Sequence, residues 1–373
     1  MTSDLDYLIV GSGLTGATIA RILFDKGFKV LILERRSHLG GNVYDHVHES
    51  GIRVHTYGPH YFRTSDEKIW QFVNRFSSFY NYVASVKSLI DGQYENWPVA
   101  ASYINKHIGL NWKPSFQNKP RNFEEAALSQ IPELIYSKFV RGYNIKQWGV
   151  DPKTLSSQLI KRFDIRNDDD ERLMPKHKYQ GLPENGYSTF MENMLKGIPV
   201  LMNVDYLKMK EAFSPKKMVI YTGPIDEYFN YNRGKLKYRG QIRSHLYLPN
   251  LLFKQPCAQV NNPSLDNGPH IRTIEWKHLM KDEYKKNILG TVLTKEVTIT
   301  PENAEDYEYP FPDQENAKLY QEYKAQARLL PGLLICGRLG EYKYYDMDQA
   351  IGRAFKLVET IIIQKLEHNK MVA

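Results

Sequence analysis

Short apolar runs separated by glycine mark the first part of the chain. Residues 7–10 form an apolar run that ends in a glycine-rich turn, 11–16, and residues 17–26 carry a helix-like pattern. A further apolar run, 28–33, closes on Glu34. Short apolar runs bounded by turn residues are typical of buried strands, and longer periodic segments are typical of helices. The pattern therefore predicts a strand, a glycine turn, a helix and a second strand.

The pattern changes twice further along the chain. Aromatic and aliphatic residues recur at three- and four-residue spacing between about 66 and 157, which predicts a mostly helical insertion. Alternating patterns dominate between 218 and 300, for example at 219–221, and we expect an antiparallel sheet there. An apolar run at 333–336, followed by a helical pattern over 349–365, predicts a strand and a helix that complete the N-terminal fold.

These changes predict an α/β protein with a Rossmann-like dinucleotide-binding domain, a helical insertion and an antiparallel sheet domain. Because the C-terminal strand and helix return to the first domain, that domain is expected to be discontinuous. The predicted boundaries are 1–75, 190–232 and 325–373 for the dinucleotide-binding domain, 76–155 for the helical insertion, and 156–189 and 233–324 for the sheet and substrate domain.

Composition limits the classes of ligand and location. Lys and Arg number 50 against 42 Asp and Glu, a net charge of +8, and the basic residues are spread among acids, which favours small phosphorylated ligands over nucleic acid. The two cysteines, Cys257 and Cys336, lie far apart, so we expect neither a disulfide framework nor a metal site. No signal peptide is evident and no apolar run approaches the ~20 residues of a membrane span, so we expect a cytoplasmic protein without membrane insertion.

The glycine turn and Glu34 have the spacing of a dinucleotide-binding fingerprint. Gly11 would allow the tight turn, Gly13 the close approach of a pyrophosphate, and Gly16 the close packing of helix on strand. Glu34 would accept hydrogen bonds from ribose hydroxyls, and the helix N-terminus would face the phosphates. The expected contacts of the turn with a dinucleotide are Gly11, Gly13, Leu14, Thr15 and Gly16.

A second glycine pair favours FAD over NAD. Glu34 is followed by Arg35 and then by Gly40, Gly41 and Asn42. In large families of FAD enzymes such a pair follows the ribose-binding acid and approaches the FAD pyrophosphate, with a basic residue nearby, whereas NAD-binding domains lack it as a rule. The alternative is that the pair belongs to a loop and nothing more.

Several further segments, in the same order and at similar spacing, resemble the UDP-galactopyranose mutase family. The resemblance extends from Gly11 past Met347 and so covers nearly the whole chain. The matching segments are YGPHYFRT (57–64), GYNIKQWG (142–149), Arg162, YQGLP with GY (179–187), RTIEWKH (272–278), Tyr309-Pro310 and GRLGEYKYYDM (337–347).

This resemblance implies a flavin-dependent isomerase that interconverts the pyranose and furanose forms of UDP-galactose or UDP-N-acetylgalactosamine. In the family, N5 of reduced FAD attacks the anomeric carbon and expels UDP, the flavin–sugar adduct opens, and the sugar recloses as a furanose. The cofactor must be reduced, so NADPH or NADH is expected as an occasional reductant. The expected partner is a nucleotide sugar, and the family is often dimeric, which suggests a homodimer.

The resemblance also assigns roles to single residues. Arg162 and Arg272 would bind the diphosphate, because planar forked donors match phosphate oxygens. The residues expected at the catalytic centre are His60, Arg63, Arg162 and Arg272. The expected substrate contacts are Phe139, Tyr143, Trp148, Arg162, Asn261, Arg272, Tyr309 and Tyr344. The expected cofactor contacts, beyond the glycine segments with Glu34, Arg35 and Asn42, are His60, Gly337, Arg338, Tyr345, Asp346 and Met347.

Two residues depart from the family pattern. Arg63 stands where the galactose enzymes carry histidine, and its length and permanent charge suggest a different sugar substituent, with a neutral exchange as the alternative. Leu173 stands where the family has a tyrosine that reaches the nucleotide. Whether the nucleotide base is uracil therefore stays open.

Other functions stay open at this point. The chain could be an FAD-dependent oxidoreductase of the amine oxidase-like class, a mutase acting on a different nucleotide-hexose, or a nucleotide-sugar-binding protein without catalysis. Arginines at these positions are also compatible with surface ion pairs, and the aromatic residues with a packed core.

Overall fold

A parallel sheet carries the N-terminal part of the chain. The computed structural model describes residues 4–109, 111–162 and 166–372. Its five-stranded sheet has the order β10-β2-β1-β11-β17, and every neighbouring pair is parallel. The strands are β1 (Tyr7–Val10), β2 (Val30–Glu34), β10 (Val200–Met202), β11 (Met218–Tyr221) and β17 (Leu333–Ile335). The central strands are almost continuously apolar and buried, as strands of a parallel sheet covered on both faces are.

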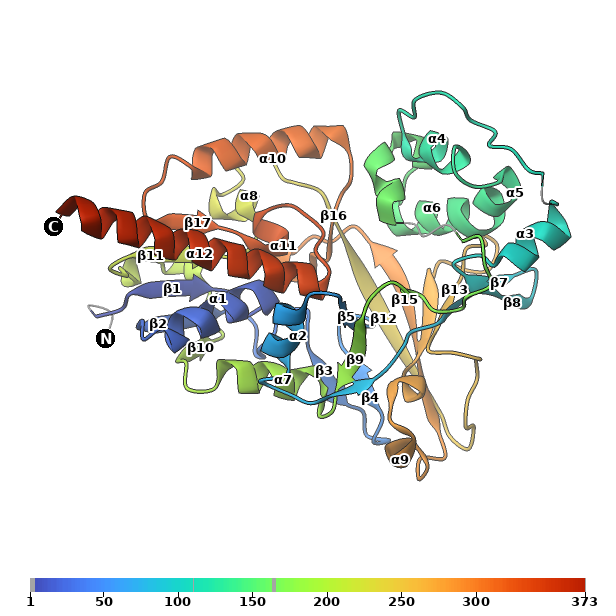
Figure 1. The fold of residues 1–373 in the computed structure, drawn as a ribbon, viewed down its shortest axis with the longest axis horizontal. Helices are drawn as coiled ribbons and strands as arrows, with labels where there is room; N and C mark the ends of the chain where they lie inside the picture. The colour runs from blue at the N-terminus through green and yellow to red at the C-terminus, as the bar shows by residue number, and fades with distance from the viewer. Residues whose placement is uncertain (1–3, 110, 163–165, 373) are drawn as a thin grey trace.

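Helices cover this sheet. α1 (Leu14–Asp25) follows β1 directly, and the long helix α12 (Met347–Val372) packs on it (Figure 1). α7 (Gly186–Leu195) also contacts α1. Side chains such as Ile9 and Ile351 are completely buried between these layers, so the largest hydrophobic core of the protein lies beneath the glycine turn.

The parallel sheet corrects one expectation from the sequence. The alternating pattern at 219–221 predicts an antiparallel strand, but β11 lies parallel between β1 and β17. A run of three or four apolar residues is the same for both kinds of buried strand, so the pattern alone could not decide. The C-terminal strand and helix return to the N-terminal sheet, as their pattern predicts.

A larger sheet of seven strands lies beside the parallel one. Its order is β16-β12-β15-β14-β13-β7-β8, and all neighbouring pairs are antiparallel except β13 with β7. The strands are β7 (Val86–Ile90), β8 (Gln93–Trp97), β12 (Tyr238–Leu248), β13 (Gln259–Asn261), β14 (Arg272–Glu275), β15 (Thr291–Ile299) and β16 (Tyr309–Pro310). The two sheets together confirm the predicted α/β class.

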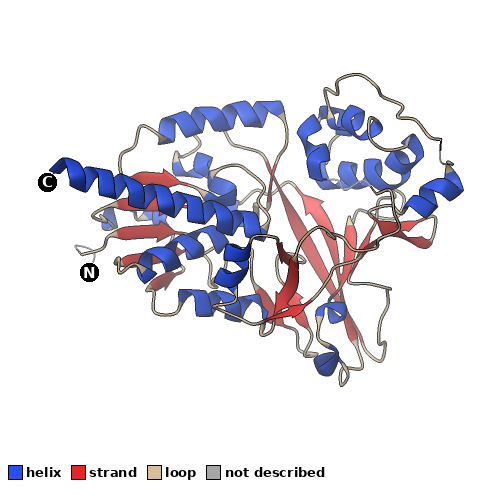
Figure 2. Cartoon of the chain, in the orientation of Figure 1, coloured by secondary structure: helices blue, strands red, loops and turns tan. Residues whose placement is uncertain are grey.

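A group of short helices lies beyond the seven-stranded sheet and has a hydrophobic core of its own (Figure 2). The helices are α3 (Ala101–His107), α4 (Phe123–Leu128), α5 (Glu133–Ile135), the π-helix η1 (Tyr136–Arg141), α6 (Gly142–Trp148), and the 3₁₀ helices η2 (Pro152–Thr154) and η3 (Ser157–Arg162). The range 76–155, expected to be helical, also contains the hairpin β7–β8, which belongs to the sheet. Its alternating residues, buried in β7 at Val86, Ser88 and Ile90, form one face of a strand.

Small sheets link the two large ones. β3 (Asp45–Val47) pairs with β4 (Arg53–His55), and β9 (Tyr179–Pro183) lies between β5 (Phe62–Thr64) and β6 (Phe79–Asn81). The remaining helices are α2 (Glu67–Val73), η4 (Tyr206–Lys208), η5 (Lys210–Ala212), α8 (Ile225–Tyr228), η6 (Trp276–Leu279), α9 (Asp282–Lys285), η7 (Ala304–Asp306), α10 (Gln314–Ala327) and α11 (Gly337–Gly340). The links bring the segment 57–64 close to both large sheets.

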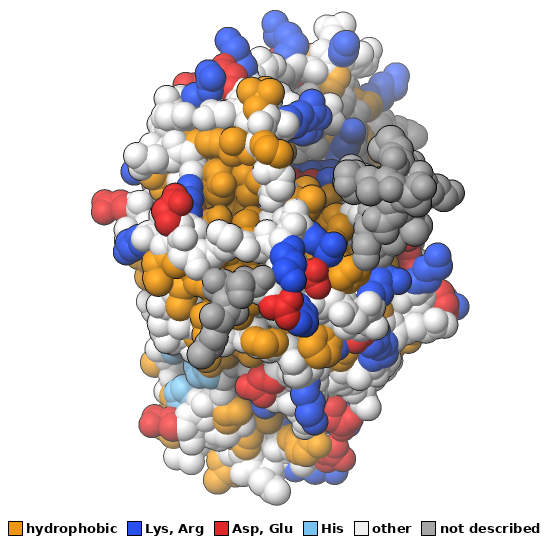
Figure 3. Space-filling model, turned by 90° about the vertical axis from the view of Figure 1, so that its left-hand side faces the viewer, with side chains coloured by type: hydrophobic (Ala, Val, Ile, Leu, Met, Phe, Trp, Pro, Cys, Tyr) orange, Lys and Arg blue, Asp and Glu red, His pale blue; other side chains and the backbone are white. Residues whose placement is uncertain are grey.

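Charges of both signs are mixed on the surface. Figure 3 shows Lys and Arg side chains dispersed among Asp and Glu on the face that bears the chain termini. Among the residues described, none of the helices combines the length and the apolar character that crossing a membrane requires.

Candidate functional site

A cavity of about 420 Å³ lies at the carboxyl ends of β1, β2 and β11, where the parallel sheet meets the seven-stranded one. Ligands of open α/β sheets bind at this edge, where the strand order reverses. Residues from both sheets line the cavity. The cofactor contacts expected from the sequence are all on its wall: Gly11, Gly13, Leu14, Thr15, Gly16, Glu34, Arg35, Gly40, Gly41, Asn42, His60, Gly337, Arg338, Tyr345, Asp346 and Met347.

Two of the three glycines in the turn, Gly11 and Gly16, have no room for a larger residue. Gly11 has φ of +100°, and a Cβ atom there would lie 2.2 Å from the Thr222 Oγ1 atom. A Cβ atom on Gly16 would lie 2.2 Å from the carbonyl oxygen of Gly11. Gly13 caps α1 without any side-chain hydrogen bond to the first turn. The first N–H groups of α1 therefore remain available to an anionic ligand.

Hydrogen bonds from neighbouring residues fix the carboxylate of Glu34. Its Oε2 accepts from the backbone N–H and the hydroxyl of Ser12, at 2.8 and 2.6 Å, and its Oε1 accepts from the backbone N–H of Arg36 at 2.9 Å. The carboxylate is buried and lines the cavity. Each oxygen keeps lone pairs for further donors, as a ribose-binding acid requires.

Arg35 and Arg36, both on the cavity wall, bind different partners. Arg35 donates to Glu227 at 2.7 Å. The sequence reasoning missed Arg36, which donates to Asn42 Oδ1 at 2.8 Å and places its guanidinium 4.5 Å from the ring centroid of Tyr57. Arg36 therefore ties the second glycine segment to the aromatic wall.

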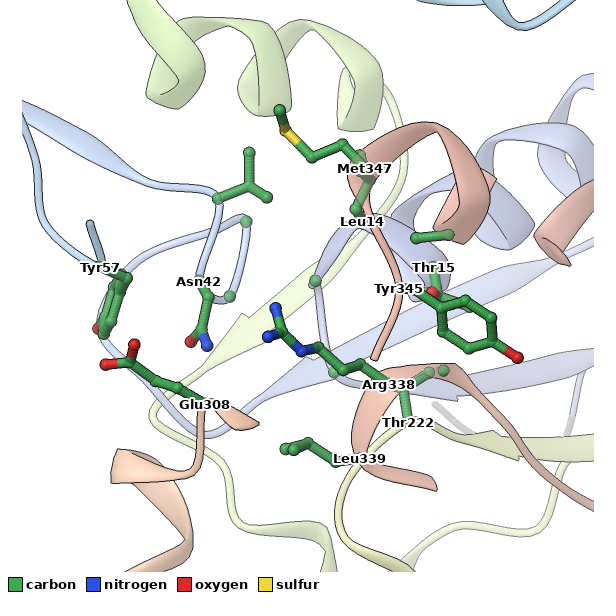
Figure 4. A pocket seen from close by; sticks show the side chains of 18 of the residues that line it. Leu14, Thr15, Asn42, Tyr57, Thr222, Glu308, Arg338, Leu339, Tyr345 and Met347 are labelled. Atoms are coloured by element: carbon green, nitrogen blue, oxygen red, sulfur yellow. The ribbon is translucent and has the colours of Figure 1, made fainter. Parts of the chain in front are cut away.

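Arg338 reaches across the middle of the cavity towards Asn42 (Figure 4). Its guanidinium lies 4.3 Å from the ring centroid of Tyr344 and 5.0 Å from that of Tyr309. Its Nε and Nη2 atoms are buried and have no hydrogen-bond partner among the described residues. Buried donors without a partner are destabilising, so these two fit a ligand that brings acceptors into the cavity.

His60 is neutral at ordinary pH. Its Nδ1 lies 2.8 Å from the carbonyl oxygen of Gly58, which can only accept, so Nδ1 carries the proton and Nε2 is an acceptor. Burial, reinforced by the neighbouring His55, lowers the pKa of His60 to about 3. The backbone N–H of His60 donates to Nδ1 of His55 at 3.1 Å, which fixes the loop that carries it.

A chain of alternating buried charges fixes Arg272. Glu296 accepts from Nε of Arg272 and, at 2.9 Å, from Nε of Arg243. The two terminal nitrogens of Arg243 donate to Glu308 at 2.7 and 2.9 Å. Arg272, Glu308 and Tyr309 line the cavity. Since Glu296 binds Nε, the terminal nitrogens of Arg272 remain for another acceptor.

Arg63 forms an ion pair inside the cavity wall. Its Nη2 donates to Asp346 Oδ2 at 3.0 Å, and its Nε is buried without a partner among the described residues. Leu173 reaches the same cavity. Its backbone donates to Ala84 at 2.7 Å and accepts from Arg166 at 3.3 Å. An apolar side chain is thus held where the family pattern has a polar one.

Among the expected substrate residues whose side chains the structure describes, four do not line this cavity: Phe139, Tyr143, Trp148 and Asn261. Phe139 and Trp148 are only 3% and 4% exposed and pack inside the helical group, Phe139 against Tyr103 and Trp148 against Phe311. Because both rings are buried, neither offers an exposed face to a base in this arrangement. Asn261 is buried and accepts from Gln259 at 3.0 Å.

Tyr143 and Arg162 differ from these core residues. Tyr143 is half-buried on α6 and close enough to Arg272 to act on its charge electrostatically. Arg162 ends η3, and its side chain lies outside the described part of the structure.

Several other residues of the cavity wall had been given no role from the sequence. Gln259, rather than Asn261, reaches the cavity, as do Tyr57, the first residue of the motif at 57–64, and Thr222, directly after β11. The additional wall is formed by Val204, Asp205, Tyr206, Leu207, Ala304, Glu305 and Glu308. The spacing of Tyr57 next to GPH could have indicated it, but the others meet the cavity only through long-range contacts.

Comparison with known proteins agrees with this geometry. The sequence profile of the family described as UDP-galactopyranose mutase matches residues 138–344, and that of an NAD(P)-binding Rossmann-like domain matches residues 9–76. The chain is 32% identical to a Klebsiella pneumoniae protein named "Probable UDP-galactopyranose mutase", with 99% of this chain and 98% of the relative aligned.

Two further relatives complete the comparison. The dTDP-fucopyranose mutase of Escherichia coli is 32% identical, with 95% of this chain and 98% of the relative aligned. A crystal structure of reduced UDP-galactopyranose mutase has the same fold, with a TM-score of 0.76, 15% identity and coverage of 96% of this chain and 95% of that one. The expectation from the sequence motifs is confirmed: the chain belongs to the UDP-galactopyranose mutase family and is an isomerase of that kind.

Proposed function

We propose that this protein is an FAD-dependent mutase that interconverts the pyranose and furanose forms of a UDP-sugar, UDP-galactose or UDP-N-acetylgalactosamine. One observation carries the proposal: a single cavity joins a dinucleotide cradle, Gly11 to Gly16, to a group of arginines and tyrosines at its other end. The cradle suits a pyrophosphate cofactor, and the arginines suit a second diphosphate, that of the substrate.

The residues present fit FAD. The glycine turn at Gly11 and the second pair at Gly40 and Gly41 leave the backbone open to a pyrophosphate, and Glu34 is fixed where a ribose would lie. The unpartnered donors of Arg338 await acceptors in the middle of the cavity. When bound and reduced, by NADPH or NADH in our proposal, the flavin supplies the nucleophile for the anomeric carbon.

The protein's own residues bind the leaving group. Arg272 would donate its terminal nitrogens to the diphosphate, and Tyr309 and Tyr344 their hydroxyls. These donors offset the negative charge that develops as the glycosidic bond breaks. Arg162 would add a second guanidinium. Neutral His60 would offer its Nε2 as an acceptor to a donor on the cofactor.

Two residues bear on which nucleotide sugar is used. Arg63, held by Asp346, presents a fixed cation whose Nε is unpartnered, and this suits a sugar that carries a carbonyl acceptor such as an acetamido group. Leu173 gives an apolar surface where the family pattern has a hydroxyl. A second candidate, a thymidine-linked 6-deoxyhexose, is favoured by the similarity to dTDP-fucopyranose mutase.

The test uses FAD-loaded protein reduced with dithionite, as wild type and as Arg63→His. Each is incubated with UDP-galactose, UDP-N-acetylgalactosamine and dTDP-fucose, and furanose formation is followed by chromatography. We expect wild type to convert the N-acetylated sugar and Arg63→His to prefer UDP-galactose. Equal turnover of UDP-galactose by both proteins, with no N-acetyl activity in either, would remove Arg63 from sugar selection.

Three other outcomes would change the function itself. Conversion of dTDP-fucose alone would establish the second candidate. Stoichiometric consumption of O2 or NAD(P) with oxidised product would instead identify an oxidoreductase. Binding of nucleotide sugars with no turnover of any would identify a binding protein.

A further inference from the structure

Helix α6 is attached to the turn between β13 and β14 by one partly buried lysine. Lys146 donates from Nζ to the carbonyl oxygens of Asn262 and His270, at 3.0 and 3.2 Å. It is partly buried, and burial lowers its pKa to about 8. Charged donors on two carbonyls make stronger contacts than neutral donors do, so this is the strongest polar link between α6 and the turn.

The same helix approaches the sheet closely at its two ends. At its beginning, a Cβ atom on Gly142 would lie 2.1 Å from the carbonyl oxygen of Pro263. At its end, Arg239 of β12 donates from Nε to the carbonyl oxygen of Gln147 at 3.0 Å. Gly142 and Lys146 are four residues apart and therefore share one face of the helix. That face is the one docked on the turn.

The turn leads directly to the diphosphate arginine. His270 lies two residues before Arg272, and Asn262 donates to Ile271 at 2.7 Å across the base of the turn. Tyr143, next to Gly142 on α6, lies within electrostatic range of Arg272. A shift of α6 along the turn would therefore change the distance between Tyr143 and Arg272.

We propose that Lys146 is a positioning residue: by clamping α6 onto the β13–β14 turn, it fixes the position of Tyr143 relative to Arg272 and so sets the affinity for the nucleotide part of the substrate. This rests on the proposed function, in which Arg272 binds the diphosphate. Lys146 itself reaches neither the cavity nor the reacting atoms. Its loss should weaken binding and leave the chemical step intact.

The test compares three variants of the FAD-loaded protein: Lys146→Met, Gly142→Ala and, as a matched control, Lys138→Met. Lys138 also lies in the helical group, where it pairs with exposed Asp91. We expect Lys146→Met to raise KM for the nucleotide sugar about tenfold, with kcat within about twofold of wild type and FAD content unchanged. Gly142→Ala should raise KM in the same direction because the added carbon separates the helix from the turn, and Lys138→Met should change nothing.

Two further readouts do not depend on turnover. UDP affinity, measured by calorimetry on the same proteins, should fall in parallel with KM. Hydrogen exchange of the amides in 262–271 should be faster in Lys146→Met than in Lys138→Met without any ligand. If no nucleotide sugar is converted, the proposed function fails, and the exchange and UDP data still decide whether the clamp exists.

Either of two results would overturn the clamp. Lys146→Met and Lys138→Met with the same KM, UDP affinity and exchange rates would show that the lysine positions nothing. A loss of kcat and of bound FAD equal to the loss in UDP affinity would show a general stabilising residue. If Lys146→Met does not fold, Gly142→Ala carries the test alone, and an unchanged KM for it would contradict the proposal.

Discussion

The two ends of the cavity are built differently. At the dinucleotide end, two glycine segments of one strand–helix–strand unit, 11–16 and 40–41, bring backbone to the cavity wall. At the substrate end, it consists of charged and aromatic side chains from β5, β14, β16 and the segment after α11. There Arg272 pairs with the buried Glu296, and Arg63 pairs with the partly exposed Asp346.

The difference explains how each end is kept in shape. Backbone in a tight turn is fixed by sterics, since Gly11 and Gly16 leave no space for a side chain. Buried guanidinium groups are fixed only as long as their carboxylates stay, because an unpaired buried charge is strongly destabilising. We therefore expect that added side-chain atoms disrupt ligand binding at the cofactor end. At the substrate end, we expect that removal of a charge partner disrupts it.

The largest effect is expected at the glycine turn. Gly11→Ala places a Cβ atom against Thr222 and should abolish FAD binding, so that less than a tenth of the purified protein carries flavin. Flavin absorbance per polypeptide measures this. Gly27→Ala is the control, because Gly27 also has positive φ, +82°, but open space around it, and should only lower stability by about 1 kcal/mol. Full flavin content in Gly11→Ala would show that the turn does not hold the cofactor.

The next effect belongs to the buried carboxylate at the substrate end. Glu296→Gln removes the charge shared by Arg243 and Arg272 and should lower the free energy of unfolding by about 3–5 kcal/mol. Turnover should fall while FAD remains bound. Urea unfolding gives the stability, with Glu315→Gln as control, since Glu315 pairs with Lys237 at the surface. A stability equal to that of the control would mean that the charge network is not needed.

Arg272→Lys tests whether the substrate end can be changed without affecting the cofactor end. Lysine keeps the charge but loses the fork that binds Glu296 and the diphosphate together, so kcat/KM should fall about 100-fold, roughly 2.7 kcal/mol. FAD content and flavin spectrum should be unchanged, in contrast to Gly11→Ala. Reduced-enzyme kinetics with the preferred nucleotide sugar measure the change. An equal loss of FAD would show that the two ends of the cavity are not separable.

The smallest effect is expected on the pH dependence of the free energy of unfolding, through a buried histidine near the cofactor end. Burial lowers the pKa of His55 to about 4, so between pH 6.5 and 4 the unfolded chain binds a proton there that the folded chain does not. Stability should therefore fall as pH falls through this window, by about 2 kcal/mol from His55 at pH 5. Urea unfolding at pH 7 and pH 5 should show a smaller difference in His55→Gln than in wild type. Replacing the exposed His107 by Gln should leave the difference unchanged.

The residues expected from the sequence at the cofactor end all line the cavity, whereas only some of those expected at the substrate end do. The turn from Gly11 to Glu34 is local, so its spacing carries its geometry, and every residue named for it lies on the cavity wall. Glu296 and Glu308 were missed, because each meets its arginine across a sheet register that no local pattern shows. Strand β11 was expected to be antiparallel, because a short apolar run looks the same in either kind of buried strand.

The aromatic residues show a second limit. Phe139, Tyr143 and Trp148 lie within a single family motif, or close to it, and the motif alone does not distinguish them. In the structure, only Tyr143 approaches Arg272, whereas Phe139 and Trp148 pack in the helical core. A helix of 3.6 residues per turn sends neighbouring side chains to different faces, and which face meets the sheet depends on the docking of α6.

The most direct measurement follows the sugar ring itself. FAD-loaded protein, reduced with dithionite under nitrogen, is incubated with UDP-galactose, UDP-N-acetylgalactosamine or dTDP-fucose, and the product is analysed by mass spectrometry and NMR. If the protein is a flavin-dependent mutase, we expect a product of unchanged mass with a furanose ring. It should form only with reduced protein, and no flavin should be oxidised per turnover. Oxidised sugar, or flavin reoxidised in proportion to product, would contradict it.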